Sequence, residues 1–105
     1  MSTVESGIST AIASITLPPG KWILNAIAGF SSNGNGFRSF NLNEVKGSTG
    51  IMVSTLPIDS GTTRVSFSTF MDIDTKTVIY LNANQTSGST LSVNGSRIDA
   101  IRVGM

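Results

Sequence analysis

Turn-forming residues recur along this chain at short intervals, and no segment between them keeps the 3.6-residue apolar spacing of a helix over three turns. Glycine, proline, asparagine and aspartate favour tight turns because they adopt or fix the backbone angles that a turn requires. The signals are Pro18-Pro19-Gly20, Asn33-Gly34-Asn35-Gly36, Lys46-Gly47-Ser48, Asp59-Ser60-Gly61, Ser87-Gly88 and Asn94-Gly95. Between them lie about eight short segments, 8–17, 21–31, 37–44, 50–56, 62–70, 76–85, 89–93 and 96–104.

Within these segments apolar and polar residues alternate with a period of two. In "RVSFST", for example, Val65 and Phe67 fall on one face and Arg64, Ser66 and Ser68 on the other. Such alternation is typical of strands that bury one face. The chain is therefore expected to be all-β, an antiparallel sandwich or barrel, and its 105 residues fit a single domain over 1–105, with 1–7 as a flexible or linker start.

Two segments are apolar on both faces. "WILNAIAGF" carries Ile23 and Ile27 on its second face, and "TVIYLNA" carries Val78 and Tyr80 on its second face. A strand that is apolar on both faces is covered on both. The cover is either a loop of the same chain or another subunit, and we favour another subunit.

Composition excludes most chemistry. The chain has no His and no Cys, so the commonest general base, the thiol nucleophile and the commonest transition-metal ligands are missing. Its net charge of +1 argues against a nucleic-acid partner, and no stretch approaches the roughly 20 apolar residues of a transmembrane helix. We therefore expect no enzyme activity, no catalytic residues, no cofactor, no metal and no membrane insertion.

Asp72 and Asp74 are the remaining candidates for chemistry. Two residues apart, they share a face of a strand, or they stand together on a loop where they could hold calcium. Calcium takes about six to eight oxygen ligands, and this stretch supplies two carboxylates. A solvated turn between 62–70 and 76–85 is the preferred interpretation, over both calcium and a glycosidase pair.

Three longer stretches, "ITLPPGKWILNAIAGF", "TVIYLNANQTSGSTL" and "IDAIRVG", resemble the framework motifs of the C1q/tumour-necrosis-factor-like jelly rolls. The version that they resemble most is the distal head of bacteriophage tail fibres and receptor-binding proteins. The resemblance implies an antiparallel jelly-roll sandwich of about eight strands that forms a homotrimer. It also implies that the last strand lies centrally in the inner sheet, next to the strand 76–85, at the threefold axis.

This placement implies a trimer interface that includes Val78, Tyr80, Arg97, Asp99 and Arg102. The three charged residues would need partners there, because an unpaired buried charge is strongly destabilising. Reciprocal Arg–Asp pairs between subunits are one solution. The other is that these residues sit at the exposed ends of the strand.

The function that the resemblance implies is the receptor-binding tip of a bacteriophage tail fibre, located in the virion at the distal end of the fibre, outside the cell. Its partners would be host cell-surface saccharide and the fibre shaft or baseplate proteins. The alternatives are a trimerisation cap or assembly chaperone of a fibre, or a secreted C1q-like lectin.

Saccharide sites combine an aromatic platform with amides, hydroxyls and one or two charges. The loop "SSNGNGFR" brings Asn33, Asn35, Phe37 and Arg38 together, and "LPIDSGTTR" contributes Asp59. These are the candidate ligand-binding residues. Trp22, the only tryptophan, follows "PPGK" at a framework position and is expected in the core or an interface rather than as a sugar platform.

Overall fold

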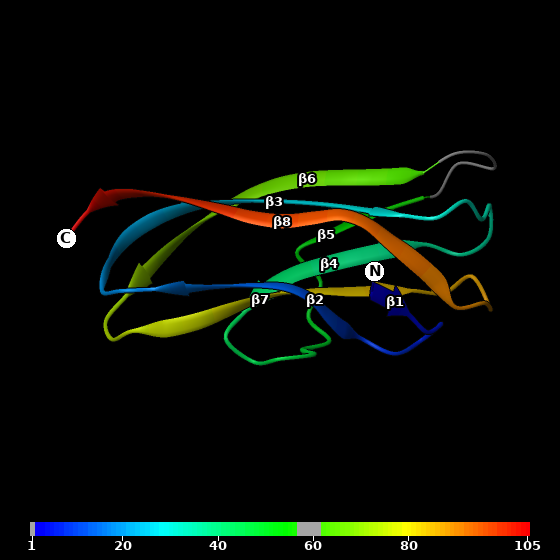
Figure 1. Ribbon diagram of the computed structural model, residues 1–105, viewed down its shortest axis with the longest axis horizontal. Helices are drawn as coiled ribbons and strands as arrows, with labels where there is room; N and C mark the ends of the chain where they lie inside the picture. Colours follow the sequence, from blue (N-terminus) through cyan, green and yellow to red (C-terminus); the bar gives the residue numbers. More distant parts are fainter. Residues whose placement is uncertain (1, 57–61) are drawn as a thin grey trace.

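The computed structural model describes residues 2–56 and 62–105, which form two four-stranded antiparallel sheets packed face to face (Figure 1). The strands are β1 (Ser2–Val4), β2 (Thr10–Leu17), β3 (Gly20–Phe30), β4 (Arg38–Asn43), β5 (Val53–Thr55), β6 (Thr63–Ile73), β7 (Thr77–Gln85) and β8 (Leu91–Gly104). No helix long and apolar enough to cross a membrane occurs in these residues. The expected all-β sandwich is confirmed.

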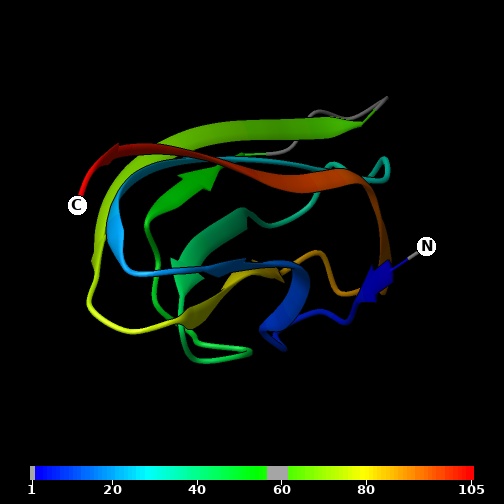
Figure 2. The ribbon, with the colours of Figure 1, turned by 60° about the vertical axis from the view of Figure 1, so that its left-hand side comes forward.

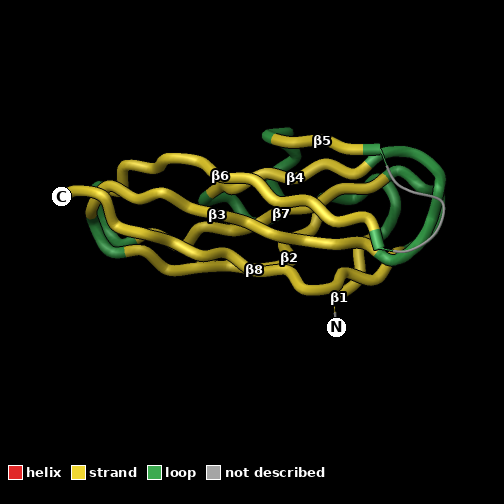
Figure 3. The backbone as a smooth tube through the Cα atoms, turned by 90° about the horizontal axis from the view of Figure 1, so that it is seen from above, coloured by secondary structure: helices red, strands yellow, loops and turns green. Residues whose placement is uncertain are grey.

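The two sheets have the orders β1-β8-β3-β6 and β2-β7-β4-β5, and they are named here the β8 sheet and the β7 sheet. The chain changes sheet at every connection except β4 to β5, so neighbours in a sheet are mostly distant in sequence. This wrapping makes the fold jelly-roll-like, and Figure 2 shows the two layers. Seen from above, the strands follow the long axis of a body of 44 × 22 × 20 Å (Figure 3).

The core lies between the sheets and is built by the period-two pattern of the strands. In β3 the side chains of Leu24, Ala26, Ala28 and Phe30 point inward and are almost completely buried. From the other sheet, β7 contributes Ile79, Leu81 and Ala83, and β4 contributes Phe40 and Leu42. Full burial of one large apolar side chain is worth roughly 1.5–3 kcal/mol, so this layer is the main source of stability.

The sequence predicted a turn between two strands at Asn94-Gly95. The structure instead has a β-bulge there, within the single strand β8. Ile27 of β3 pairs with Arg97 and Gly29 pairs with Asn94, so one residue of β3 faces two of β8. Gly95 takes a positive φ of 63° there, a conformation that glycine adopts at little cost. The same dipeptide that closes hairpins here bends a strand without ending it.

Part of the stretch 1–7, expected as a flexible or linker start, forms a strand. Ser2–Val4 forms β1 at the edge of the β8 sheet, where Val4 pairs with Leu91. Val4 is fully buried, and its carbonyl accepts a 2.9 Å hydrogen bond from Nε2 of Gln85. Burial of one side chain and pairing with a long strand together order a segment that is too short to show periodicity.

The predicted neighbourhood of the last strand is also corrected. β8 is an inner strand, as expected, but its neighbours are β1 and β3. β7, the strand predicted to lie beside it, lies in the opposite sheet between β2 and β4. β7 and β8 therefore cannot stand side by side at one axis.

Candidate functional site

The predicted ligand-binding loop lies at the end of the sandwich away from the C-terminus (Figure 1), between β3 and β4. Arg38, at its end, is fully buried and points into the sandwich. Its Nη1 donates to the carbonyl oxygens of Asn35 (2.9 Å) and Phe37 (3.2 Å), and its Nη2 donates to that of Asn33 (2.7 Å). Arg38 thus holds the loop through three main-chain carbonyls.

No carboxylate pairs with Arg38 among the described residues, and its Nε has no hydrogen-bond partner there. The guanidinium lies 5.8 Å from the centre of the Phe30 ring. Desolvation by burial lowers the pKa of Arg38. Its charge is enclosed by the loop, so Arg38 positions the loop rather than meeting a ligand from solvent.

The remaining loop residues differ in their exposure. Asn33 is half-buried and its Oδ1 accepts a 2.9 Å bond from the backbone N of Asn35, which closes a small turn. Asn35 is exposed, and Phe37 is 40% exposed. Asn35 and Phe37 are therefore the predicted ligand residues of this loop that face solvent. Asp59, the fifth candidate, lies outside the described residues.

The loop is also fixed to the β7–β8 connection. The backbone N of Phe37 donates to Oγ1 of Thr86 (3.0 Å), and the backbone N of Thr86 donates to the carbonyl of Phe37 (3.2 Å). Gly36 passes so close that a Cβ there would lie 2.2 Å from the Thr86 carbonyl oxygen. The backbone that carries Phe37 is consequently fixed by its contacts with Thr86.

A second candidate surface is the outer face of the β8 sheet. In the strand register Ile101 pairs with Ile23, and Ile23 pairs with Phe70, so these three side chains form one row across β8, β3 and β6. Their exposed fractions are 68%, 38% and 53%. We call Ile23, Phe70 and Ile101 the apolar row. It confirms the placement of Ile23 on the second face of its strand, and no described segment covers it.

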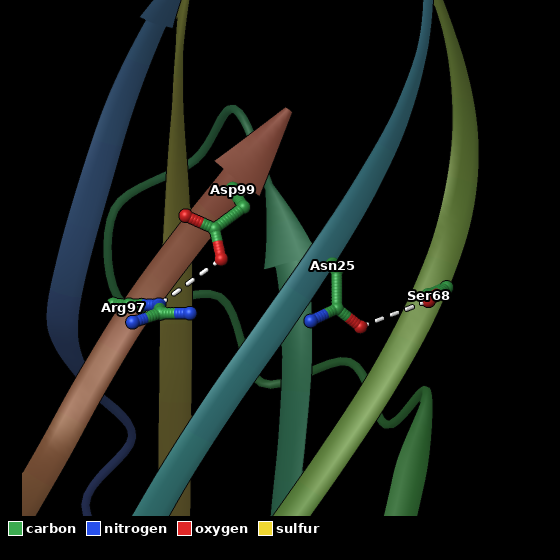
Figure 4. A network of polar contacts seen from close by, with 4 residues as sticks. All are labelled: Asn25, Ser68, Arg97 and Asp99. Carbon is green, nitrogen blue, oxygen red and sulfur yellow. Dashed lines mark hydrogen bonds and ion pairs between the residues drawn. The ribbon is translucent and has the colours of Figure 1, made fainter. Parts of the chain in front are cut away.

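Beside the apolar row lies a polar one, shown in Figure 4. Arg97 Nε pairs with Oδ2 of Asp99 at 3.0 Å, two residues along the same strand, and both side chains are exposed. On the adjacent strands, Ser68 donates a 3.0 Å bond to Oδ1 of Asn25. Arg97 and Asp99 therefore partner each other within one subunit, an arrangement that neither of the two predicted solutions contained.

Arg102 lies at the C-terminal end of the molecule and packs on Trp22. Its guanidinium lies 5.0 Å from the centre of the indole ring, and its Nη2 donates to the carbonyl of Pro19. The indole Nε1 donates to the carbonyl of Pro18 at 3.1 Å, and the ring is half-buried against the core. Trp22 is thus a packed framework residue with a cation on its face, consistent with the preferred interpretation.

Val78 and Tyr80 point outward from the β7 sheet, on the side of the sandwich opposite Arg97 and Asp99. The five predicted interface residues therefore divide between two faces, with Arg102 at one end.

Part of the β7 sheet is covered by the connection from β4 to β5. Asn82 is fully buried beneath it, although it occupies an outward-facing position. Its Nδ2 donates to Oδ1 of Asn41 (3.0 Å) and to the carbonyl of Val45 (3.1 Å), and its Oδ1 accepts from the backbone N of Gly47 (2.8 Å). For this part of β7 the cover is a loop of the same chain.

Beside this connection, a pocket of about 250 Å³ opens on the β7 sheet. Its lining residues are Ala11, Ile12, Ala13, Ser14, Lys46 and Tyr80. We call it the Tyr80 pocket. Sequence reasoning missed it; the available signal was the pair of asparagines, Asn41 and Asn82, at outward positions of two central strands.

A second pocket, of about 330 Å³, lies between the C-terminal end of β6, which contains Asp72, and Glu44, which follows β4. These two carboxylates share it with five other residues, Leu42, Asn43, Met71, Ile73 and Ile79. Asp74 lies in the following turn. In the described part of the chain no three His, Cys, Asp or Glu residues gather as metal ligands.

No family model, no curated protein and no solved structure matches this chain.

Proposed function

We propose that this chain is a non-enzymatic binding module, the receptor-binding tip of a bacteriophage tail fibre, which assembles as a homotrimer and attaches to saccharide on the host cell surface. The observation that carries the assembly is the apolar row on the outer face of the β8 sheet. Contiguous exposed apolar side chains on a soluble protein are typical of interaction surfaces. Full burial of one large apolar side chain contributes roughly 1.5–3 kcal/mol. Ile101 and Phe70 would each contribute, against another subunit, the part of this energy that corresponds to their exposed surface.

A closed ring of three subunits needs two different surfaces on each subunit, because the contact is head-to-tail. The second surface that we propose is an exposed apolar group at the β5 edge, formed by Ile51, Met52 and Leu56. It lies on a different side of the sandwich from the apolar row, since β5 is the edge strand of the β7 sheet, whereas the row crosses the outer face of the β8 sheet from β8 through β3 to β6. This geometry suits a ring rather than a two-fold pair.

The strand order supports membership of the C1q/tumour-necrosis-factor-like jelly rolls. The orders β1-β8-β3-β6 and β2-β7-β4-β5 place the first and last strands side by side and alternate the chain between sheets, as a jelly roll does. In this proposal the outer face of the β8 sheet lines the threefold axis, and Val78 and Tyr80 leave the predicted interface.

Attachment would use surfaces away from the axis. At the end of the sandwich farthest from the C-terminus, Phe37 supplies an aromatic ring and Asn35 an amide on a braced loop, a combination that suits sugar. Three copies per trimer, and many trimers per particle, multiply a weak affinity at each site. The location that follows is the distal end of the fibre in the virion, with fibre shaft or baseplate proteins as the remaining partners.

Two measurements on the purified chain test this proposal. Light scattering should give the mass of three chains, and the protein should bind envelope polysaccharide of its host, less well as Phe37→Ala and unchanged as Thr75→Ala, a control in an exposed turn. A mass of one chain would refute the assembly. A trimer that binds no host polysaccharide would favour the alternative function, a trimerisation cap or assembly chaperone.

A further inference from the structure

The Tyr80 pocket combines groups that recognise one kind of ligand. Its one aromatic side chain is Tyr80 of β7, its one cation is Lys46 of the β4–β5 connection, and Ser14 of β2 adds an exposed hydroxyl. No acidic residue lines it; Glu44, two residues before Lys46, lines the other pocket instead. Lys46 forms no ion pair with any described residue.

Lys46 is held in position by its neighbours in sequence. The residue before it, Val45, accepts a hydrogen bond at its carbonyl from Asn82, and the residue after it, Gly47, donates from its backbone N to the same side chain. Asn82 is fully buried and is itself bonded to Asn41. The backbone on both sides of the lysine is thus hydrogen-bonded to one buried amide. These bonds fix the main chain from which the Lys46 side chain extends.

The floor of the pocket comes from an irregularity in β2. The register with β7 shifts between Ala11 and Ala13, which leaves Ile12 as the extra residue of a bulge. Ser14 pairs with Tyr80 in this register, so a small side chain and an aromatic one are neighbours on the outer face of the sheet. Small residues next to an aromatic ring leave room for a flat ligand against that ring.

The volume limits the size of the ligand. About 250 Å³ is slightly below the range of roughly 300–1,000 Å³ that accommodates drug-sized molecules. One sugar ring fits this limit, whereas a longer saccharide would have to continue outside. The remaining sugars of such a saccharide would then lie in solvent.

We propose that the Tyr80 pocket binds a single carboxylated sugar ring, with an apolar face of the sugar on the Tyr80 ring and its carboxylate paired with Lys46. The pocket is a second saccharide site, separate from Asn35 and Phe37, and the assignment rests on the proposed function, since it names a class of saccharide that the tip would recognise. The pocket remains open in the proposed trimer, because it lies on the β7 sheet at the β2 side, away from both the apolar row and the β5 edge.

The sequence provides a direct probe, because Tyr80 is the only tyrosine. Protein labelled with carbon-13 in its tyrosine ring gives one set of ring signals in the NMR spectrum, all from this pocket. Titration with methyl glucuronide should shift these signals with saturation. Methyl glucoside, which lacks the carboxylate, and sodium acetate, which lacks the ring, should shift them much less at equal concentration.

Three variants separate the roles of the residues. Lys46→Gln should raise the Kd for methyl glucuronide about threefold to fivefold and remove most of its salt dependence. Tyr80→Ala, followed through the backbone amides of Ala11 and Ser14, should raise it roughly fivefold to tenfold. Lys76→Gln, an exposed lysine outside the pocket, should leave it unchanged.

Several outcomes would overturn the assignment. Equal shifts with the glucoside would remove the carboxylate preference, and equal shifts with acetate would mean a simple anion site. No saturable shift would remove the site altogether. Failure of the proposed function looks different: methyl glucuronide then binds as described while no host polysaccharide does. If host polysaccharide binds equally to wild type, Lys46→Gln and Tyr80→Ala, the function stands and this site is wrong.

Discussion

The side-chain amide of Asn82 donates a 3.0 Å hydrogen bond to the side-chain oxygen of Asn41 on the neighbouring strand, beneath a loop that both residues hold. Asn41 in turn donates to the carbonyl of Ser48 at 3.0 Å. Two amides on the outward face of a sheet thereby replace the apolar contacts that usually fix a long connection. The loop that carries Lys46 is held at this point by hydrogen bonds from two buried amides.

Replacement of Asn82 by leucine, which has a similar volume, should therefore strongly destabilise the protein. The change leaves the backbone N of Gly47 and the carbonyl of Val45 without their buried partner, and we expect the free energy of unfolding to fall by about 2–4 kcal/mol. Urea denaturation at one protein concentration measures it. Asn25→Ala removes an amide bonded at the surface and should change stability by only about 0.5 kcal/mol. Equal effects of the two changes would contradict this account.

Arg38→Lys should not be a conservative change. A lysine ammonium cannot reproduce the forked geometry with which the guanidinium reaches three carbonyls, so we expect a loss of roughly 1–3 kcal/mol at pH 7. Urea denaturation of the two proteins measures the difference.

The same pair of proteins gives a prediction for pH. Burial lowers the pKa of a lysine below its usual value of about 10.4, so near that pH the unfolded variant binds more protons than the folded one and the variant's stability rises with pH. Arginine stays protonated over this range. The gap between the proteins should therefore narrow from pH 7 to pH 10, and a constant gap would show that the lysine has escaped to solvent.

Ile101→Asp should abolish the proposed trimer, whereas Tyr80→Asp should leave it intact. The first change places a carboxylate in the apolar row, where assembly would bury it without a partner, and the second lies on the opposite sheet. Light scattering of both variants decides between the two faces. A trimer of Ile101→Asp, or the loss of the trimer in Tyr80→Asp, contradicts the placement of the axis.

Gly95→Ala should destabilise the protein by about 1–2 kcal/mol, because the positive φ of the bulge disfavours any Cβ and the new methyl group would lie 3.1 Å from Nη1 of Arg64. Gly104→Ala is the matched control in the same strand, since its φ is not positive and its Cβ would meet Lys21 at an ordinary 3.4 Å. Thermal unfolding of both variants measures the difference. Similar melting temperatures would contradict the importance of the bulge.

The sequence predicted those parts of the fold that depend on local pattern. The alternation in "WILNAIAGF" correctly places Leu24 and Phe30 inside and Ile23 outside. β1 escaped prediction because three residues show no periodicity, and the bulge because Asn94-Gly95 carries the same local signal as a hairpin. The sheet to which β7 belongs depends on pairing between distant segments, which no local pattern encodes.

The candidate site was less predictable for a related reason. Arginine is a residue type that often binds ligands, so the sequence suggested that role for Arg38. The path of the preceding loop is what encloses its guanidinium among main-chain carbonyls. The Tyr80 pocket depends on where a connection folds back over the sheet, and that is fixed by Asn82, 36 positions away from Lys46 in the chain. Both outcomes are set by contacts between distant segments.

Arg38 grips the loop before β4 through main-chain oxygens, which every amino acid supplies, and touches none of the loop's side chains by hydrogen bond. The shape of the loop therefore depends little on the side chains at positions 35 and 37. Position 36 requires glycine, because a Cβ there would collide with Thr86. Mutations can exchange the two exposed side chains and keep the scaffold. If this loop binds saccharide, as proposed, single substitutions at positions 35 and 37 should change its specificity while the three carbonyl contacts of Arg38 are kept.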